Sequence, residues 1–364
     1  MVQAPRPYNL VAELTYRCPL RCVYCSNPVG WRDVPDALDG ALWSRAFAEA
    51  AALGIVHVGL TGGEPTLHPD LDSIVSGAAA SGLYVHLVTA GTTLGRVDLA
   101  RLRAQGLRSV QLSFQDVEAE AGDRIAGARV HAKKLAFAEA VRAEELPLTL
   151  NVVLHRHNLA RVGELIELAR SLGALRLELA NAQYDGMAYV NRAALLPTRA
   201  QLDLAADVVT RARAQSPAPE ILWVLPDHHR DRPRPCMGGW ASRTLVLAPD
   251  GLALPCHAAA SLPGLAFWRF PERSLAECWR DAPGMNAFRG EGWMREPCRT
   301  CPERARDFGG CRCQAFRLAG DPAEADPACA LSPHHGVVLA ARTEAEQAAP
   351  DFVYRGAKGV GSHP

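Results

Sequence analysis

The sequence predicts an α/β protein, a partial (β/α)6 barrel followed by a small, irregular C-terminal domain that is rich in thiols. Strand-like and helix-like segments alternate over the first half of the chain, which implies a parallel sheet with right-handed crossovers. The eleven cysteines fall into two groups, three near the start and eight from Cys236 to Cys329. The regular alternation of strand-like and helix-like segments stops at Ser216-Pro217-Ala218-Pro219, so we expect two chemically different parts.

The expected strands are short and mostly apolar, and the expected helices carry apolar residues at helical spacing. The strands span residues 8–14, 55–60, 84–88, 109–114, 148–153 and 175–179. The helices span residues 42–53, 71–81, 97–105, 130–144, 161–172 and 198–215. In a barrel of this kind the chemistry collects at the carboxyl ends of the strands.

The predicted domain limits follow these changes of texture. Residues 1–215 form the barrel, 216–235 a bridging segment, 236–331 the thiol-rich domain and 332–364 a C-terminal tail without sustained periodicity. Pro249-Asp250-Gly251 predicts a hairpin turn inside the thiol-rich domain. The paired histidines, His228 with His229 and His334 with His335, are interpreted as residues of solvated loops rather than as metal ligands.

Charge and compartment limit the classes of partner. The chain has 39 basic and 39 acidic residues, so neither nucleic acid nor an anionic membrane is expected as an obligatory partner. The start of the chain lacks the pattern of a signal peptide, and no apolar run approaches the ~20 residues of a membrane span. We therefore expect a cytoplasmic protein, in which the thiols stay reduced and serve metals rather than disulfides.

Three thiols, Cys18, Cys22 and Cys25, form a C-x3-C-x2-C run directly after the first expected strand. Three thiolates on one tight loop can hold three irons of a cubane and leave the fourth iron open to a small ligand. The alternative is a structural zinc loop, which requires a fourth protein ligand, and no nearby histidine has a suitable spacing.

A second motif, Gly62-Gly63-Glu64-Pro65, follows the next expected strand. Glycines there let the backbone approach a ligand closely, and a carboxylate can accept hydrogen bonds from an ammonium group. The alternative is a simple Gly-Pro turn that carries a surface glutamate. The cysteine motif earlier in the chain favours the first interpretation.

Polar residues close three further expected strands. They are Thr89 with Gly91, Ser113 with Gln115, and Asn151. A polar side chain that ends an apolar strand of a barrel can face a bound ligand, and it can equally be a satisfied hydroxyl or amide of the core. The sequence leaves both interpretations open for these positions.

The thiol run, with Tyr24 before its last cysteine, and the Gly-Gly-Glu-Pro run together resemble the radical S-adenosylmethionine (SAM) enzymes. The resemblance implies a barrel of radical SAM type and a [4Fe–4S] cluster on Cys18, Cys22 and Cys25 whose fourth iron binds SAM. It implies that Glu64 and its neighbours hold the amino group of SAM. Side chains at the other strand ends would contact the ribose and carboxylate of SAM; these are Thr89, Ser113 and Asn151.

The run Cys298-x2-Cys301-x5-Asp307-x3-Cys311 resembles the SPASM extension of peptide-modifying radical SAM enzymes, with Asp307 where that pattern has a cysteine. The resemblance implies two auxiliary iron–sulfur clusters. One, [2Fe–2S] or [4Fe–4S], would be held by Cys236, Cys256, Cys311 and Cys313. The other, [4Fe–4S], would be held by Cys298, Cys301, Cys329 and Asp307. In the alternative, Asp307 is solvated and one iron stays open. Cys278 is left over and is interpreted as a core residue.

The run from Ala12 to Pro28 resembles the family of peptide cyclases of pyrroloquinoline quinone biosynthesis. The resemblance implies that a glutamate side chain is cross-linked to a tyrosine ring within the precursor peptide PqqA. It also implies the peptide chaperone PqqD and a flavodoxin-like electron donor as partners. There are three alternatives. The chain could be an enzyme that matures another ribosomal peptide, an enzyme of haem side-chain chemistry, or a non-catalytic iron–sulfur electron carrier.

Overall fold

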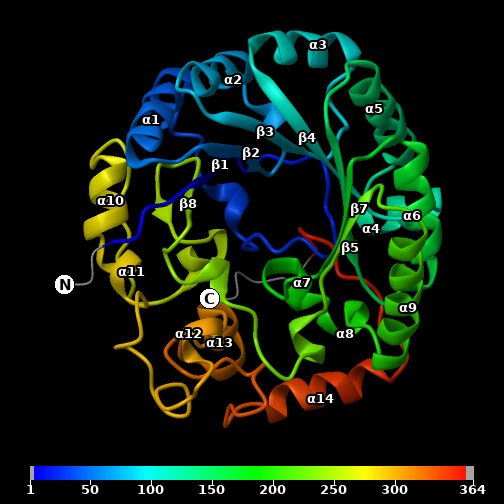
Figure 1. The fold of residues 1–364 in the computed structure, drawn as a ribbon, viewed down its shortest axis with the longest axis vertical. Helices are drawn as coiled ribbons and strands as arrows, with labels where there is room; N and C mark the ends of the chain where they lie inside the picture. Colours follow the sequence, from blue (N-terminus) through cyan, green and yellow to red (C-terminus); the bar gives the residue numbers. More distant parts are fainter. Residues whose placement is uncertain (1–3, 358–364) are drawn as a thin grey trace.

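A computed structural model describes residues 4–357 and is built on one nine-stranded sheet (Figure 1). The strand order is β7-β6-β5-β4-β3-β2-β1-β8-β9, and every neighbouring pair except β8 and β9 is parallel. The strands are β1 (Asn9–Thr15), β2 (His57–Gly62), β3 (Tyr84–Thr89), β4 (Leu107–Phe114), β5 (Leu148–Leu154), β6 (Arg176–Asn181), β7 (Glu220–Trp223), β8 (Thr244–Leu247) and β9 (Ala253–Leu254).

Helices connect the strands of the barrel and cover the outer side of the curved sheet (Figure 1). In the barrel they are α1 (Gly40–Leu53), α2 (Leu71–Ala80), α3 (Arg96–Gln105), α4 (Ala119–Ala126), α5 (His131–Ala143), α6 (Val162–Ser171), α7 (Gly186–Val190), α8 (Arg192–Leu195) and α9 (Arg199–Gln215). Beyond it are α10 (Leu275–Asp281), α11 (Pro283–Asn286), α12 (Arg304–Asp307), α13 (Arg312–Ala319) and α14 (Gly336–Ala345). None of the helices in the described part of the chain is both long and apolar enough to cross a membrane.

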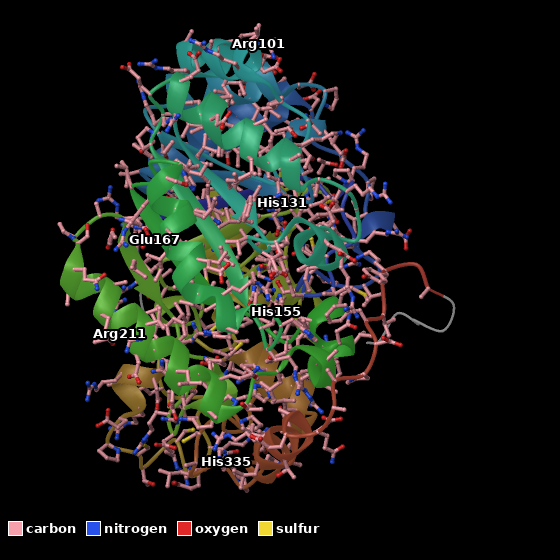
Figure 2. All side chains as sticks on the ribbon, turned by 90° about the vertical axis from the view of Figure 1, so that its right-hand side faces the viewer. Arg101, His131, His155, Glu167, Arg211 and His335 are labelled. Carbon is pink, nitrogen blue, oxygen red and sulfur yellow. The ribbon has the colours of Figure 1, made fainter. Side chains whose placement is uncertain are left out.

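The predicted partial barrel is confirmed, because β1 to β6 pair in chain order and the sheet stays open. Its core consists of strand residues such as Leu10, Leu60 and Leu112, which are fully buried between the strands and the surrounding helices. Polar residues on the outer helices point to solvent. Figure 2 shows Arg101, Glu167 and Arg211 on these helices and His155, which is fully buried, in the interior.

Local signals explain where the barrel helices begin and end. The Asp39 side chain accepts a hydrogen bond from the Leu42 backbone N–H at 2.9 Å and caps α1. Gly54 ends the same helix with a φ of +95°, a conformation that favours glycine. At α9, Thr198 and Gln201 form a capping box. The sequence therefore contains the start and stop signals that the long helices obey.

The structure differs from the sequence-based prediction outside the central barrel. β7 lies in the predicted bridging segment and pairs with β6. The predicted hairpin turn at Pro249–Gly251 is confirmed, because β8 and β9 pair antiparallel on either side of it, and β8 also pairs with β1. The short helices α4, α7 and α8 escaped prediction because they are shorter than a clear periodic pattern requires. The prediction of a tail without a helix is wrong for 336–345, where α14 forms, and residues 358–364 of that tail lie outside the described residues. Contacts with α8 and the segment at 227–229 stabilise α14.

Candidate active site

The loop with the first three thiols leaves the carboxyl end of β1 and is held by its backbone. The Cys25 N–H donates to the Cys22 carbonyl at 3.1 Å, which closes a tight turn. The Val23 N–H donates to the Ile125 carbonyl of α4 at 3.1 Å, and the Cys25 carbonyl accepts from Met187 of α7 at 2.9 Å. Two short helices that the sequence did not predict therefore position the thiols.

A cavity of about 330 Å³ opens at the carboxyl ends of the barrel strands. Its lining includes the three thiols, the two glycines of the second motif and two of the three predicted strand-end residues, but no carboxylate side chain. The lining includes Cys18, Cys22, Cys25, Gly62, Gly63, Thr89, Ser113, Asn181 and Arg355. The cavity is therefore neutral to positive apart from its thiols.

The two glycines are required by the close packing of β2 against the thiol loop. A Cβ atom on Gly62 would lie 2.4 Å from the Thr15 carbonyl oxygen, and one on Gly63 would lie 2.4 Å from the Arg17 carbonyl oxygen. Gly62 also has a φ of +128°. Any side chain here would displace the backbone that delivers Cys18, so the glycines are needed to keep the thiols in place.

Glu64 is completely buried, and its carboxylate is engaged by protein donors. Oε1 accepts from the hydroxyl of Thr66 at 2.6 Å and the hydroxyl of Thr89 at 2.7 Å, while Oε2 accepts from the Ala90 N–H at 2.7 Å. Neither Glu64 nor Pro65 lines the cavity, which instead meets the backbone of the two glycines. The role of Glu64 toward SAM stays a prediction, and its observed contacts brace the end of β3.

The other predicted strand-end residues have different surroundings. Thr89 also accepts from the Gly91 N–H at 3.0 Å, and Ser113 lines the cavity. The Asn151 amide donates to Glu178 on β6 at 3.1 Å and does not line the cavity. Thr89 and Ser113 thus lie where a bound ligand could reach them, whereas Asn151 has a partner inside the sheet.

A buried lysine accompanies the thiols. Lys134 of α5 is 1% exposed and donates to the Ser113 carbonyl at 2.7 Å. Burial raises the pKa of the Cys22 thiol to about 12, and the Lys134 charge opposes that rise. Burial also lowers the pKa of Lys134 to about 8, against which the charges of Cys22 and Glu64 act. Because iron binds thiolates, a fixed cation here favours the ligand form of the cysteines.

A second cavity, of about 340 Å³, contains all four thiols that were predicted for one auxiliary cluster. It is lined by Cys236, Cys256, Cys311 and Cys313. The sulfur atoms of Cys256 and Cys313 are 3.8 Å apart. Hydrogen bonds from Cys236 and Cys313 lower the pKa of the Cys256 thiol below its ordinary value. Ala182 and Gln183, after β6, line both this cavity and the first, so the two cavities are neighbours.

The second predicted ligand set also comes together, around a smaller cavity. Its lining includes Cys298, Cys301, Cys329 and Asp307. The Asp307 carboxylate accepts from the Gly309 N–H at 2.9 Å, and Arg232 donates to the Cys301 sulfur at 3.2 Å. The proximity of these side chains is a finding, and their roles as cluster ligands stay predictions.

The remaining thiol and the paired histidines complete the predicted residues. Cys278 is fully buried in α10, as expected of a core residue. The interpretation of His228 and His229 as solvated is wrong, since both are less than 9% exposed. The reason is α14, whose Arg342 donates to the His228 carbonyl and helps to cover that segment. The His335 Nδ1–H donates to the Pro327 carbonyl oxygen at 2.8 Å.

The ligand chemistry fits iron–sulfur clusters. None of the eleven cysteines forms a disulfide, and no set of three His, Cys, Asp or Glu side chains within residues 4–357 converges as a single metal ion would require. A cluster does not need such convergence, because each thiolate binds a different iron. The three-thiol loop, open to a cavity on one side, therefore suits a cluster with one free iron.

Comparison with known proteins decides the family. The Radical SAM superfamily model matches residues 12–169. The PqqA peptide cyclase of Methylocella silvestris is 49% identical over 363 residues, which cover 98% of this chain and 97% of that relative. The PqqA peptide cyclase of Streptomyces rochei is 49% identical, with 96% and 97% covered. The chain belongs to the PqqA peptide cyclases.

Solved structures of other radical SAM enzymes share the fold of this family member. Streptococcus suis SuiB bound to S-adenosylmethionine superposes with a TM-score of 0.73 at 18% identity, covering 87% of this chain and 75% of SuiB. Native anSMEcpe with bound AdoMet gives a TM-score of 0.67 at 18% identity, covering 93% of this chain and 97% of anSMEcpe. Membership of the superfamily implies a SAM-binding [4Fe–4S] cluster, and the three-thiol loop is the site that fits it.

Several residues of the site were missed from the sequence. Asn181 ends β6 and lines the first cavity, and neither its amide nitrogen nor its carbonyl oxygen has a partner within the described chain. The signal that selected Thr89, a polar residue closing an apolar strand, applies equally to Asn181. Lys134 could have been noticed as a lysine on the apolar face of a helix. Arg355 carried no local signal, because its contacts lie at the other end of the chain.

Proposed function

We propose that this chain cyclises the precursor peptide PqqA by joining a glutamate side-chain carbon to a tyrosine ring, as an early step of pyrroloquinoline quinone biosynthesis. One observation carries the proposal. A three-thiol loop opens on a cavity without carboxylates, in a chain that is 49% identical to PqqA peptide cyclases over nearly its whole length. The positive lining of this cavity suits an acidic side chain of a peptide.

Each part of the first cavity has a task in this proposal. Cys18, Cys22 and Cys25 hold the [4Fe–4S] cluster, and the backbone of the Gly62–Gly63 turn with Thr89 and Ser113 positions SAM. When bound, the cluster and SAM supply the radical that removes a hydrogen atom from the substrate.

Asn181 is the residue best placed to orient the substrate. Its amide offers one donor and one acceptor in the cavity, and both lack protein partners within residues 4–357. A peptide amide presents the complementary pair. Leaving both atoms unpaired in a buried site is costly, so a ligand that pairs with them gains affinity and orientation.

The neighbouring cavities provide for the rest of the reaction. Formation of the bond and recovery of the aromatic ring require the loss of two hydrogens in all, one as an atom to the SAM-derived radical and one as a proton and an electron. We assign an auxiliary cluster on Cys236, Cys256, Cys311 and Cys313 as the electron acceptor, and a second on Cys298, Cys301, Cys329 and Asp307. The wall shared by the first two cavities, at Ala182 and Gln183, supports this arrangement.

The proposal includes further partners and a compartment. PqqD would present the peptide, and a flavodoxin-like protein would supply electrons. Eleven cysteines without a disulfide suit a reducing cytoplasm.

An anaerobic reaction tests the function. Iron-loaded protein is incubated with reductant, SAM, PqqA and PqqD, and both 5′-deoxyadenosine and peptide mass are measured. We expect deoxyadenosine and a peptide lighter by two hydrogens, with the cross-link between Glu and Tyr located by fragmentation. Deoxyadenosine with an unchanged peptide would assign the chain to another substrate. Absence of deoxyadenosine from a cluster-replete sample would support an electron carrier.

A further inference from the structure

A segment near the carboxyl end, Phe352–Arg355, lies against the loop that carries the first three thiols; we call it the C-terminal strap. After α14 the chain turns back toward the centre of the molecule (Figure 1). The buried Asn191 amide joins strap and loop. Its oxygen accepts from the Val353 N–H at 2.7 Å, and its nitrogen donates to the Val353 carbonyl at 2.8 Å and the Val23 carbonyl at 3.0 Å. One side chain therefore holds the strap next to Cys22.

The middle of the strap makes further contacts around the same loop. The Tyr354 hydroxyl donates to the Arg124 carbonyl at 2.8 Å, and the Arg21 guanidinium lies 5.9 Å from the centre of the Tyr354 ring. The Arg124 guanidinium lies 4.9 Å from the centre of the Phe352 ring. Arg21 belongs to the thiol loop and Arg124 to α4, so the strap spans both.

Arg355 holds the backbone that follows the third thiol. Its guanidinium donates to the carbonyl oxygens of Asn27 at 3.1 Å and Pro28 at 2.9 Å, and also to that of Val29. It lies 5.3 Å from the centre of the Trp31 ring. A planar guanidinium can bind several oxygens at once, which a lysine cannot do in the same geometry.

Besides these contacts, Arg355 lines the first cavity. The side chain is 7% exposed and lines the cavity together with Arg21, where no carboxylate is present. Among residues 4–357 it has no acidic side chain within ion-pair distance, although it is buried. Buried charges are normally paired, so a cation in this position favours a negative partner inside the cavity.

We propose that the C-terminal strap is part of the SAM site and that Arg355 is a positioning residue for it. Arg355 holds Asn27, whose amide in turn donates to the Gly62 carbonyl at 3.3 Å. Strap, thiol loop and Gly-Gly turn thus form one connected wall around the site. The remaining positive charge favours the thiolate-bound cluster and the carboxylate of SAM. This inference depends on the SAM site and not on which peptide is modified.

SAM binding by the iron-loaded, full-length protein in the absence of peptide tests the proposal. We expect Arg355→Gln to raise the Kd for SAM about tenfold, the effect of losing a charged contact. The change that SAM causes in the electron paramagnetic resonance spectrum of the reduced cluster should become incomplete. Arg355→Lys should raise the Kd for SAM less, because it keeps the positive charge but loses the planar guanidinium that binds several oxygens at once.

The matched control is Arg213→Gln on α9. Arg213 also donates to a backbone carbonyl, that of Ile221 at 2.6 Å, but it does not line the first cavity. This variant should bind SAM like the parent protein, so that a general loss of stability is separated from the proposed role.

Two results would overturn the proposal. The first is an Arg355→Gln protein with full iron content whose SAM affinity lies within twofold of the parent and whose spectrum responds fully to SAM. If Arg355→Gln does not retain iron, the Arg355→Lys protein decides, and an unchanged Kd there is the second. Failure of the parent to modify PqqA would count against the proposed function alone, since SAM affinity is measured without peptide.

Discussion

The barrel and the thiol-rich C-terminal region bring cysteines together by different means. In the barrel, one loop carries three thiols, and strands with fully buried leucines position its start. In the C-terminal region the thiols come from segments between residues 236 and 329, and the regular elements there are short; β9 has two residues and α12 has four. Regular secondary structure positions the first set, whereas distant segments must meet to form the others.

Side chains replace the sheet as the scaffold of the C-terminal region. Arg312 is buried and donates to the carbonyls of Pro322 and Glu324, both at 2.8 Å. The buried Asp326 accepts from the Cys311 N–H at 2.7 Å and the Gln314 amide at 2.8 Å. Between residues 298 and 331 the buried hydrophobic residues of the core are only cysteines and alanines, so metal binding is expected to supply part of the folding free energy there. The following predictions test this difference between the barrel and the C-terminal region.

The largest effect is expected at the first thiol site. Cys22→Ser should remove about four irons per chain and abolish deoxyadenosine formation, because two thiolates do not retain the cluster. The barrel should stay folded, since its strands do not depend on the iron. Iron analysis, circular dichroism and product assay measure these effects. The control is Cys278→Ser, which changes a buried thiol outside all three sites and should keep iron and activity. Formation of deoxyadenosine by Cys22→Ser would contradict the assignment of Cys22 as a cluster ligand.

Removal of all iron should loosen the two regions unequally. We expect amide exchange in residues 298–331 to accelerate by about 100-fold, while β1 to β6 change by less than about threefold. Hydrogen exchange read by mass spectrometry, with and without chelator under reducing conditions, gives both values. Equal acceleration in the two regions would show that the clusters stabilise the barrel as much as the C-terminal region.

A buried carboxylate should matter for barrel stability without iron. Glu64→Gln replaces one of the two accepting carboxylate oxygens with an NH2 group, which can only donate. A donor would then face the donors that Glu64 binds, and we expect the free energy of unfolding to fall by about 2 kcal/mol. Urea unfolding of iron-free protein measures it. Glu178→Gln, whose side chain accepts from Asn151, is the control and should cost less. An equal loss in both variants would argue against the bracing role of Glu64.

Acid should destabilise the barrel through buried neutral histidines. Burial lowers the pKa of His86 to about 4, while in the unfolded chain it stays near the ordinary value of about 6.5. Between these values the unfolded state binds more protons, so stability falls as the pH drops from about 6.5 to about 4. Urea midpoints of iron-free protein should show this fall, and His86→Asn should reduce it.

The smallest effect is expected at Asp307. Asp307→Cys exchanges an oxygen ligand for a softer thiolate, so the protein should retain its iron but shift the potential and spectrum of one auxiliary cluster. Redox titration followed by electron paramagnetic resonance detects the shift. Asp321→Asn, which removes a surface ion pair with Arg295, should leave the spectrum as it was. An unchanged spectrum in Asp307→Cys would remove the ligand assignment.

The features that the sequence by itself determined are short-range ones. Alternating apolar segments with caps and glycine stops predicted β1 to β6 and the long helices, because these elements depend on residues a few positions apart. The two ligand motifs could be recognised for the same reason, because each consists of residues close together in the sequence. The spacing of Cys18, Cys22 and Cys25, for example, places them on one loop whatever surrounds it. Resemblance to a family extended this to the distant thiol sets, whose side chains the structure brings together.

Only the tertiary structure decided which remote side chains complete the site. Arg355 reaches the thiol loop from some 330 residues away in the chain, as the separations of 326 to 328 positions in its hydrogen bonds show. Glu64 faces four donors rather than the cavity, and α14 helps to bury His228. These outcomes depend on long-range packing, in which a buried polar group takes whatever partner the fold brings near, and no local pattern encodes that partner.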